Sequence, residues 1–258
     1  CDSHTESRQK TLYDSCGIET LKITNLQKKN KNYNPLGSLG LGLIMLFEEA
    51  KFIGNLMHEL NPEDVFPLCN LGSSNEELAK IRQPWIDKFI FEPAREKGYK
   101  VVNVDIKKHP GVDLVGDVTN PEFMKKLKKI GFKSVICSNL LEHVPNESRS
   151  EICNSLIELI PKKGYFFISG PYKFPYHPDP IDTMFRPNIE EMANLFPNTT
   201  LIKSSIITSN DHKKPLELLK NIARIFMPFY KPNEWLFFPR QFPWLFKNYK
   251  ATCIVMQN

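Results

Sequence analysis

Short apolar runs alternate along this chain with longer stretches in which apolar residues recur every three or four positions. Runs of the first kind predict strands buried on both faces, and stretches of the second kind predict helices that cover them. This alternation is typical of an open α/β sheet with mostly parallel strands. The predicted strands are 65–71, 101–105, 112–115, 135–137, 165–169, 200–208 and 250–256.

The clearest helical periodicity precedes the first strand. Between Leu39 and Leu60 the apolar residues recur at intervals of three and four, which predicts an amphipathic helix that lies across the sheet. Residues 1–60 are therefore interpreted as an N-terminal arm with this helix, and residues 61–258 as the main domain, which has an insert at about 212–249. Further helices are predicted at 77–90 with a kink at Pro84, and at 121–129, 147–160 and 188–196.

The stretch 132–144 is the centre of the sequence interpretation. Its apolar run 135–137 ends at Ser138 and Asn139, and the polar pair Glu142 and His143 follows just before a predicted helix. Open α/β sheets bind their ligands at such carboxyl ends of strands. The Glu-His pair is therefore a candidate for chemistry, with a solvated helix-capping turn as the alternative.

Other predicted strands also end in polar residues. The first ends in Gly72-Ser73-Ser74, where a glycine permits a sharp turn and small side chains permit close approach of a ligand. Asp105 ends the second strand, where it could bind the two ribose hydroxyls of a nucleoside. Asp117 follows the third strand, where it could accept a hydrogen bond from an adenine amino group. Each aspartate could instead cap a turn.

The dinucleotide fingerprint G-x-G-x-x-G is absent from the first turn. Glu76 and Glu77 lie near the start of the following helix, where their charge would oppose a pyrophosphate but tolerate a cationic ligand. Both observations argue against a nicotinamide dinucleotide as the cofactor.

Two segments rich in aromatic residues and proline are candidates for binding a substrate. The loop 172–187 follows the fifth strand, and loops of this kind commonly carry function. His177, Asp179 and Asp182 in it form only a loose metal-ligand pattern, so substrate recognition is the preferred interpretation. The segment 216–246 is interpreted as a cap on the sheet, with contact to a membrane interface or an apolar substrate groove as the alternative.

Composition narrows the class of protein. The formal charge of +5 comes with lysines in scattered pairs, which indicates solvated helix faces and argues against a nucleic-acid surface. The six cysteines contain no C-x-x-C pair, and Cys69, Cys137 and Cys253 lie in apolar runs, where a free thiol behaves as a small hydrophobe. No uncharged apolar run is long enough to span a membrane. We therefore expect a cytoplasmic protein.

The strand-end motifs together resemble those of class I S-adenosylmethionine-dependent methyltransferases, specifically the type 11 branch. The resemblance covers roughly residues 65–208 and 250–256, and its most specific part is Leu141-Glu142-His143-Val144. It implies a doubly wound, Rossmann-like α/β sheet of seven strands, in which the last strand is antiparallel and lies between the fifth and the sixth. It also implies S-adenosylmethionine as the cofactor.

By position, the resemblance implies a role for each motif. The first turn would contact the methionine part of the cofactor, the second strand end the ribose, the third the adenine, and the fourth the sulfonium. The residues so implied are Asn70, Gly72, Ser73, Ser74, Asp105, Ile106, Asp117, Val118, Asn139 and Leu140. The first motif departs from the family, because Asn70 stands where an acid is common and Ser74 and Glu76 stand where glycines are common.

The expected reaction is an in-line displacement of the methyl group by a nucleophile of the acceptor. His143 is the first candidate for a general base and His177 the second, because histidine titrates near neutral pH. Tyr172, Tyr176, Asp179 and Arg186 are the candidate substrate-binding residues, and Arg186 could instead pair with an aspartate of its own loop. The expected acceptor is a small molecule, a lipid or a glycan conjugate. The alternatives are a catalytically inactive binding protein and a nicotinamide-dependent oxidoreductase.

Overall fold

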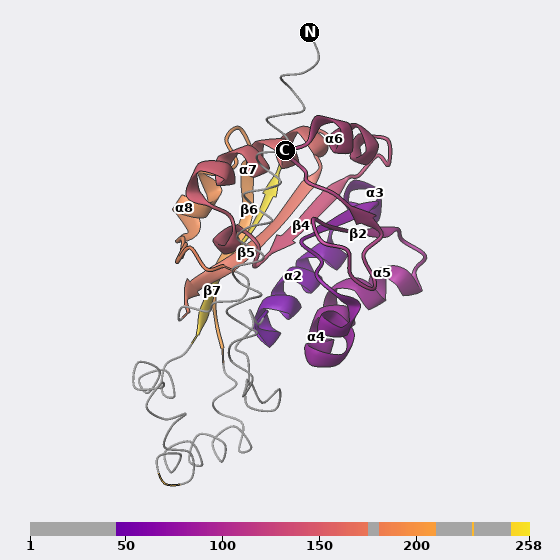
Figure 1. Cartoon of the computed structure of the whole chain (residues 1–258). Helices are drawn as coiled ribbons and strands as arrows, with labels where there is room; N and C mark the ends of the chain where they lie inside the picture. The colour runs from indigo at the N-terminus through magenta and orange to yellow at the C-terminus, as the bar shows by residue number, and fades with distance from the viewer. Residues whose placement is uncertain (1–44, 175–180, 210–228, 230–248) are drawn as a thin grey trace, which may run out of the picture. The chain divides into compact units, whose positions relative to one another are not determined.

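A computed structural model of the chain describes residues 45–174, 181–209, 229 and 249–258. These residues contain a seven-stranded sheet in the order β3-β2-β1-β4-β5-β7-β6 (Figure 1). The strands are β1 (Leu68–Leu71), β2 (Val101–Asp105), β3 (Leu114–Val115), β4 (Ser134–Ser138), β5 (Tyr165–Lys173), β6 (Thr200–Thr208) and β7 (Lys250–Gln257).

The direction of the strands divides the sheet into two parts. Strands β1 to β5 are parallel to their neighbours among them, whereas β7 runs antiparallel to both β5 and β6. The last strand therefore lies between the fifth and the sixth in the reverse direction. The predicted doubly wound sheet of seven strands, with a reversed last strand between the fifth and the sixth, is confirmed by this order and these directions.

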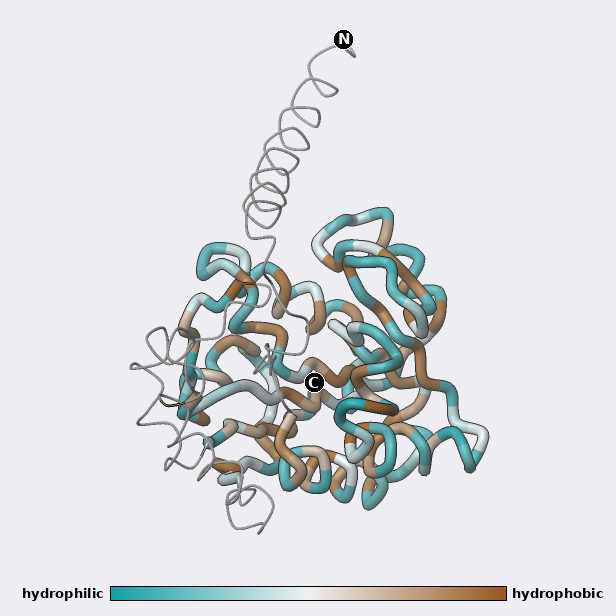
Figure 2. Tube along the Cα trace, turned by 60° about the horizontal axis from the view of Figure 1, so that its bottom comes forward, coloured by the Kyte–Doolittle hydropathy of each residue, from teal (hydrophilic) through white to brown (hydrophobic). Residues whose placement is uncertain are grey.

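Helices cover both faces of the sheet (Figure 1). One face packs against α6 (Pro121–Lys128), α7 (Asn146–Leu159) and α8 (Ile189–Ala193). The other packs against α2 (Phe47–Glu59), α3 (Pro62–Val65) and a segment built from η1 (Leu78–Arg82), α4 (Pro84–Ile86), η2 (Asp87–Phe91) and α5 (Glu92–Glu96). Hydrophobic segments lie inward along the strands, and the connecting loops are mostly hydrophilic (Figure 2).

Several helices begin where the sequence supplies an asparagine cap. Asn61 and Asn120 each accept backbone N–H bonds of the first turn, and a proline follows each of them at the first helical position. Asn188 and Glu191 form a reciprocal capping box at the start of α8. These side chains satisfy backbone donors that a helix start leaves without partners, so local sequence fixes where the helices begin.

Helix α2 packs tightly into its face of the domain. Ala50, Ile53 and Met57 are at most 1% exposed, and a side chain at Gly54 would overlap the backbone carbonyl oxygen of Phe89. The main chain just before the helix is held as well, because the N–H of Met45 donates to Gln83 at 3.0 Å and its carbonyl accepts from Trp85 at 2.8 Å. The predicted amphipathic helix is thus present at 47–59, but its predicted start is wrong, because Leu46 is extended and the helix begins at Phe47.

Several predicted boundaries are wrong. Strand β1 begins at Leu68 and not at residue 65, because residues 62–65 form α3. Strand β5 does not end at residue 169, before Gly170-Pro171, but continues to Lys173, paired with β7 through a register shift between Pro171 and Lys173. The prediction of one helix over 77–90 with a kink at Pro84 also fails, because the segment is broken at Gln83, whose φ of −133° and ψ of 62° are not helical. Proline removes a backbone donor, which ends a regular helix but can be tolerated in a strand at a bulge.

The buried cysteines match the sequence interpretation. Cys69, Cys137 and Cys253 are buried free thiols, and burial raises the pKa of Cys69 to about 12. Among the helices that the structure describes, none combines the length and apolarity needed to cross a bilayer.

Candidate active site

The turn after β1 is shaped by two residues in left-handed conformation, Gly72 at φ 70° and Ser74 at φ 55°. The N–H of Gly72 donates to the carbonyl of Val104 at 2.9 Å, which holds the turn against β2. A Cβ atom at Gly72 would lie 3.0 Å from a methyl carbon of Leu140, beyond the end of β4. The glycine is therefore required twice, by its φ angle and by this close approach.

Asp105 at the end of β2 joins that turn to the next loop. Its Oδ2 accepts the N–H of Ser74 at 2.8 Å, and its Oδ1 accepts the N–H of Lys107 at 2.9 Å. A carboxylate oxygen has two lone pairs, so each oxygen keeps capacity for a further donor. Gly72 and Asp105 are therefore brought together as predicted. The carboxylate of Asp105 is held in place and can still accept further hydrogen bonds.

Three further residues implied by the resemblance make contacts within the protein. Asn70 donates from Nδ2 to Asn103 at 2.9 Å, which links the side chains of β1 and β2. Asp117 accepts both the N–H and the hydroxyl of Thr119 at 2.8 Å, so its carboxylate also shapes a turn. Val118 is 5% exposed and belongs to the core. Ser73 is half-buried, and Ile106 is exposed.

The tip of β4 carries a second strained position. Asn139 has φ 52°, and its N–H donates to the carbonyl of Ser169 on the neighbouring strand β5 at 2.9 Å. Its side chain donates from Nδ2 to Oε1 of Glu49 at 3.2 Å. The left-handed conformation favours asparagine among residues other than glycine. The residue predicted to flank the sulfonium is thus fixed by the sheet on one side and by α2 on the other.

Glu49 is a site residue that the sequence interpretation missed. It is 0% exposed, its Oε2 accepts the N–H of Leu46 at 3.0 Å, and burial raises its pKa to about 7 against the lowering effect of its hydrogen bonds. A signal was present, because Glu49 lies four residues before Ile53 on the apolar face of the predicted helix. An acid on such a face is seldom buried without a partner.

Glu142 follows β4 in the short helix η3 (Leu141–His143) and is 1% exposed. Burial raises its pKa to about 8; Arg186 opposes this shift, and Glu49 and Asp182 add to it. Neither carboxyl oxygen accepts a hydrogen bond from the residues that the structure describes. The alternative of a solvated side chain is therefore wrong for Glu142.

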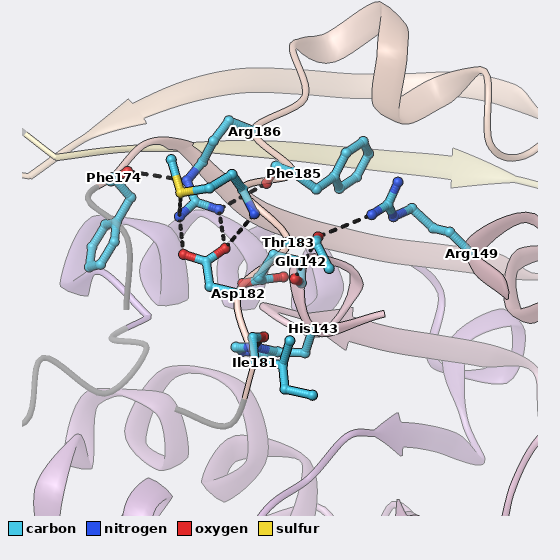
Figure 3. Close-up of polar contacts among 10 residues, drawn as sticks. Glu142, His143, Arg149, Phe174, Ile181, Asp182, Thr183, Phe185 and Arg186 are labelled. Atoms are coloured by element: carbon cyan, nitrogen blue, oxygen red, sulfur yellow. Dashed lines mark hydrogen bonds and ion pairs between the residues drawn. The ribbon is translucent and has the colours of Figure 1, made fainter. Parts of the chain in front are cut away.

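His143 lies beside the segment that begins at residue 181. Its Nδ1 is 2.6 Å from the carbonyl oxygen of Ile181 (Figure 3). A carbonyl can only accept a hydrogen bond, so Nδ1 carries the proton and the lone pair of the neutral ring lies on Nε2. This is the tautomer that a general base acting through Nε2 needs.

An ion pair braces the segment 181–187. The guanidinium of Arg186 binds both carboxylate oxygens of Asp182, at 2.5 and 3.0 Å, and also donates to the carbonyls of Phe174 and Phe185 (Figure 3). The side chain of Asp182 is 0% exposed and that of Arg186 is 12% exposed. The internal pairing that the sequence left open for Arg186 is thus present, and binding of an acceptor by this residue stays a prediction.

A second arginine joins the same segment to the turn after β4. Arg149 of α7 donates to the carbonyls of Leu141 and Val144, and its guanidinium lies 3.7 Å from the ring centroid of Phe185. It also donates to the hydroxyl of Thr183, which itself donates to the carbonyl of Glu142 at 2.8 Å (Figure 3). The backbone around Glu142 and His143 is therefore held from two elements.

Some candidate residues lie outside the part of the chain that the structure describes. These are His177, Tyr176 and Asp179, together with nearly all of the predicted insert. Tyr172, near the end of β5, is 39% exposed. Within the described ranges there is no group of three or more histidine, cysteine or acidic side chains that could hold a metal ion.

No family model matches the chain, and no curated protein matches it. Solved structures that are similar to it include an S-adenosylmethionine-dependent methyltransferase from Anabaena variabilis, with 15% identity and a TM-score of 0.46 over 80% of this chain and 82% of that one. A methyltransferase of the same cofactor class from Archaeoglobus fulgidus has 13% identity and a TM-score of 0.40 over 81% and 94%. The [4+2]-cyclase SpnF has 9% identity and a TM-score of 0.48 over 82% of both chains. At such values a likeness assigns neither an activity nor a ligand.

Proposed function

We propose that the chain is an enzyme that binds S-adenosylmethionine at the carboxyl edge of its sheet and transfers the methyl group to a small-molecule acceptor. The observation that supports this most is the meeting of Gly72, Asp105 and Leu140 around the turn after β1, in a sheet of this order. Ligands of open α/β sheets bind at this edge. When bound, the cofactor supplies a methyl group on a positively charged sulfur, which is left as a neutral thioether.

The residues present fit this cofactor. Asp105 keeps acceptor capacity for two ribose hydroxyls, and Leu140 can approach the turn after β1 closely because residue 72 has no side chain. Asn139 and Leu140 would lie beside the sulfur. The acids Glu49 and Glu142 suit a cationic ligand better than the pyrophosphate of a dinucleotide, which supports this proposal over a nicotinamide-dependent oxidoreductase.

The chain's own contribution to catalysis would be alignment, exclusion of water and removal of a proton from the acceptor. We assign the last role to Nε2 of His143, because Nδ1 is occupied by the carbonyl of Ile181. The expected acceptor is a small molecule, with a lipid or a glycan conjugate included in that proposal.

Replacing Asp105 by alanine is expected to weaken binding of S-adenosylhomocysteine by about 10- to 150-fold, since loss of charge-assisted hydrogen bonds costs about 1.5–3 kcal/mol. Isothermal titration calorimetry measures this effect. Asp105→Asn keeps an acceptor oxygen and should lose less. Asp87→Asn is the matched control, because the carboxylate of Asp87 pairs with Arg95 and not with the turn at residues 72–74, so its loss should leave the affinity unchanged.

An unchanged dissociation constant for Asp105→Ala, with the protein still folded, would refute the assignment of Asp105. Failure of the unaltered protein to bind S-adenosylmethionine or S-adenosylhomocysteine would refute the proposed function itself. Binding of the cofactor without transfer to any acceptor would favour the inactive binding protein.

A further inference from the structure

Two fully buried carboxyl groups flank the tip of β4 from opposite faces of the sheet. Glu49 comes from α2 on one face and bonds to Asn139. Glu142 lies on the other face, where its Oε2 is 3.9 Å from the position of a Cβ atom on Gly170, next to Met192 of α8. Their exposures are 0% and 1%. The proposed methyl-transfer point therefore lies between two acids that water does not reach.

Among the described residues, neither carboxyl group forms an ion pair, and the nearby charge of Arg186 only partly opposes the effect of burial on the pKa of Glu142. Arg186 binds Asp182, and Arg149 binds backbone carbonyls, Asn146 and Thr183. Glu49 is held by neutral groups, namely the N–H of Leu46 and the side chains of Asn139 and Ser169, and neither oxygen of Glu142 receives a donor among these residues. Burial of a charged carboxylate without a partner is costly, so such a group either keeps its proton or binds a cation brought from outside.

From this geometry we propose that Glu49 and Glu142 form a cation-binding site at the methyl-transfer point, and that the acceptor is an amine. The proposal rests on the proposed function and names its substrate class. An amine bound as its ammonium ion would supply the N–H donors and the positive charge that the two acids lack. A carboxylic acid or a phosphate at the same place would meet two like charges.

For an amine acceptor, the residues present account for every proton and electron pair of the reaction. The bound ammonium group first loses one proton, which we assign to Nε2 of His143. The freed nitrogen lone pair then forms the new bond to the methyl carbon, and the electron pair of the broken carbon–sulfur bond stays on sulfur. Glu49 and Glu142 remain carboxylates throughout and hold the positive charge near the nitrogen.

The site should respond to pH because its acids titrate near neutrality. The pKa values of Glu49, about 7, and Glu142, about 8, are both raised mainly by burial. The charged groups around them are Arg186 and Asp182 from the segment 181–187 and Arg149 from α7, and the thiols of Cys137, Cys153 and Cys253 also lie nearby. Cation binding needs the deprotonated acids, so it should strengthen as the pH rises from 6 to 9.

The test compares two ligands that differ at the transfer point. Sinefungin carries an amine-bearing carbon where S-adenosylhomocysteine has its neutral sulfur, so its ammonium group lies where the transferable methyl group would be, next to the proposed position of the acceptor nitrogen. We expect sinefungin to bind more tightly than S-adenosylhomocysteine by about tenfold or more, because close charge pairs can add this much to affinity. The ratio should grow between pH 6 and pH 9 and fall towards one in Glu142→Gln. Glu147→Gln, an exposed acid of α7, is the matched control and should keep the ratio of the unaltered protein.

A ratio near one in the unaltered protein at pH 9 would overturn the inference, as would a ratio that survives in both Glu142→Gln and Glu49→Gln. If Glu142→Gln fails to fold, the pH dependence of the unaltered protein and the Glu49→Gln variant still decide it. Absence of S-adenosylhomocysteine binding in the unaltered protein is a different result, because it refutes the proposed function on which the inference rests.

Discussion

Replacing Arg186 by methionine is expected to lower the free energy of unfolding by about 3–5 kcal/mol, the cost of removing one partner from a buried ion pair. The carboxylate of Asp182, whose side chain is 0% exposed, would lose the guanidinium that binds both of its oxygens and would keep the neutral N–H of Met184. Urea denaturation followed by circular dichroism measures this loss. Lys125→Met is the matched control: Lys125 pairs with Glu122 on the surface, and such pairs contribute at most about 1 kcal/mol.

The double variant Asp182→Asn with Arg186→Met completes a thermodynamic cycle. It should recover part of the lost stability, because it no longer leaves a buried charge without its partner. The opposite result has a clear meaning for the site. If Arg186→Met keeps its stability but loses methyl transfer, Arg186 binds an anionic group of the acceptor and the brace is of minor importance.

Replacing His143 by alanine is expected to reduce the rate of methyl transfer by about 10²- to 10⁴-fold, the usual contribution of a general base. Affinity for S-adenosylhomocysteine should stay unchanged, because the imidazole is assigned to the acceptor and not to the cofactor. A coupled assay of S-adenosylhomocysteine production, with an amine acceptor, measures the rate. His58→Ala is the control, since His58 also bonds to a backbone carbonyl, that of Ile90, but lies on α2 away from the strand ends.

The variant His143→Gln separates a base from a positioning residue. Glutamine can donate to the carbonyl of Ile181 but cannot take up a proton. Recovery of the rate in His143→Gln would mean that His143 acts by holding the segment 181–187. Normal rates in His143→Ala would mean that catalysis is alignment alone or that another base serves; His177 remains the other candidate.

Most of the sheet could be predicted because its strands are short apolar runs with polar ends. The boundaries of β2 and β6 agree with the sequence prediction, since each run is bounded by turn or cap residues. The end of β5 could not be predicted in this way. Strand β4 ends beside Ser169, so at Pro171 strand β5 is paired with β7 alone. The missing N–H of Pro171 therefore costs less than it would between two paired strands.

The site was predictable to the extent that it depends on strand ends. The closeness of Gly72, Asp105 and Leu140 follows from parallel strands that end at one edge. The two buried acids were harder to predict, because burial is a property of tertiary packing. Glu49 bonds to Asn139, which is ninety residues away in the sequence. The sequence around Glu142 is typical of a solvated turn, and the burial of Glu142 depends on its contact with the segment 181–187.

The two hydrogen bonds of the Met45 backbone have a consequence for the way the domain opens. They connect the start of α2 to Gln83 and Trp85, at the break between η1 and α4, and Gly54 packs on the backbone of η2. Helix α2 cannot separate from this segment without exposing buried polar groups. The amides of α2 and of 84–96 should therefore exchange with solvent as one cooperative unit. Because this unit contains Glu49, which bonds to Asn139 at the tip of β4, a ligand bound at that tip would slow exchange in α2 and in 84–96 together.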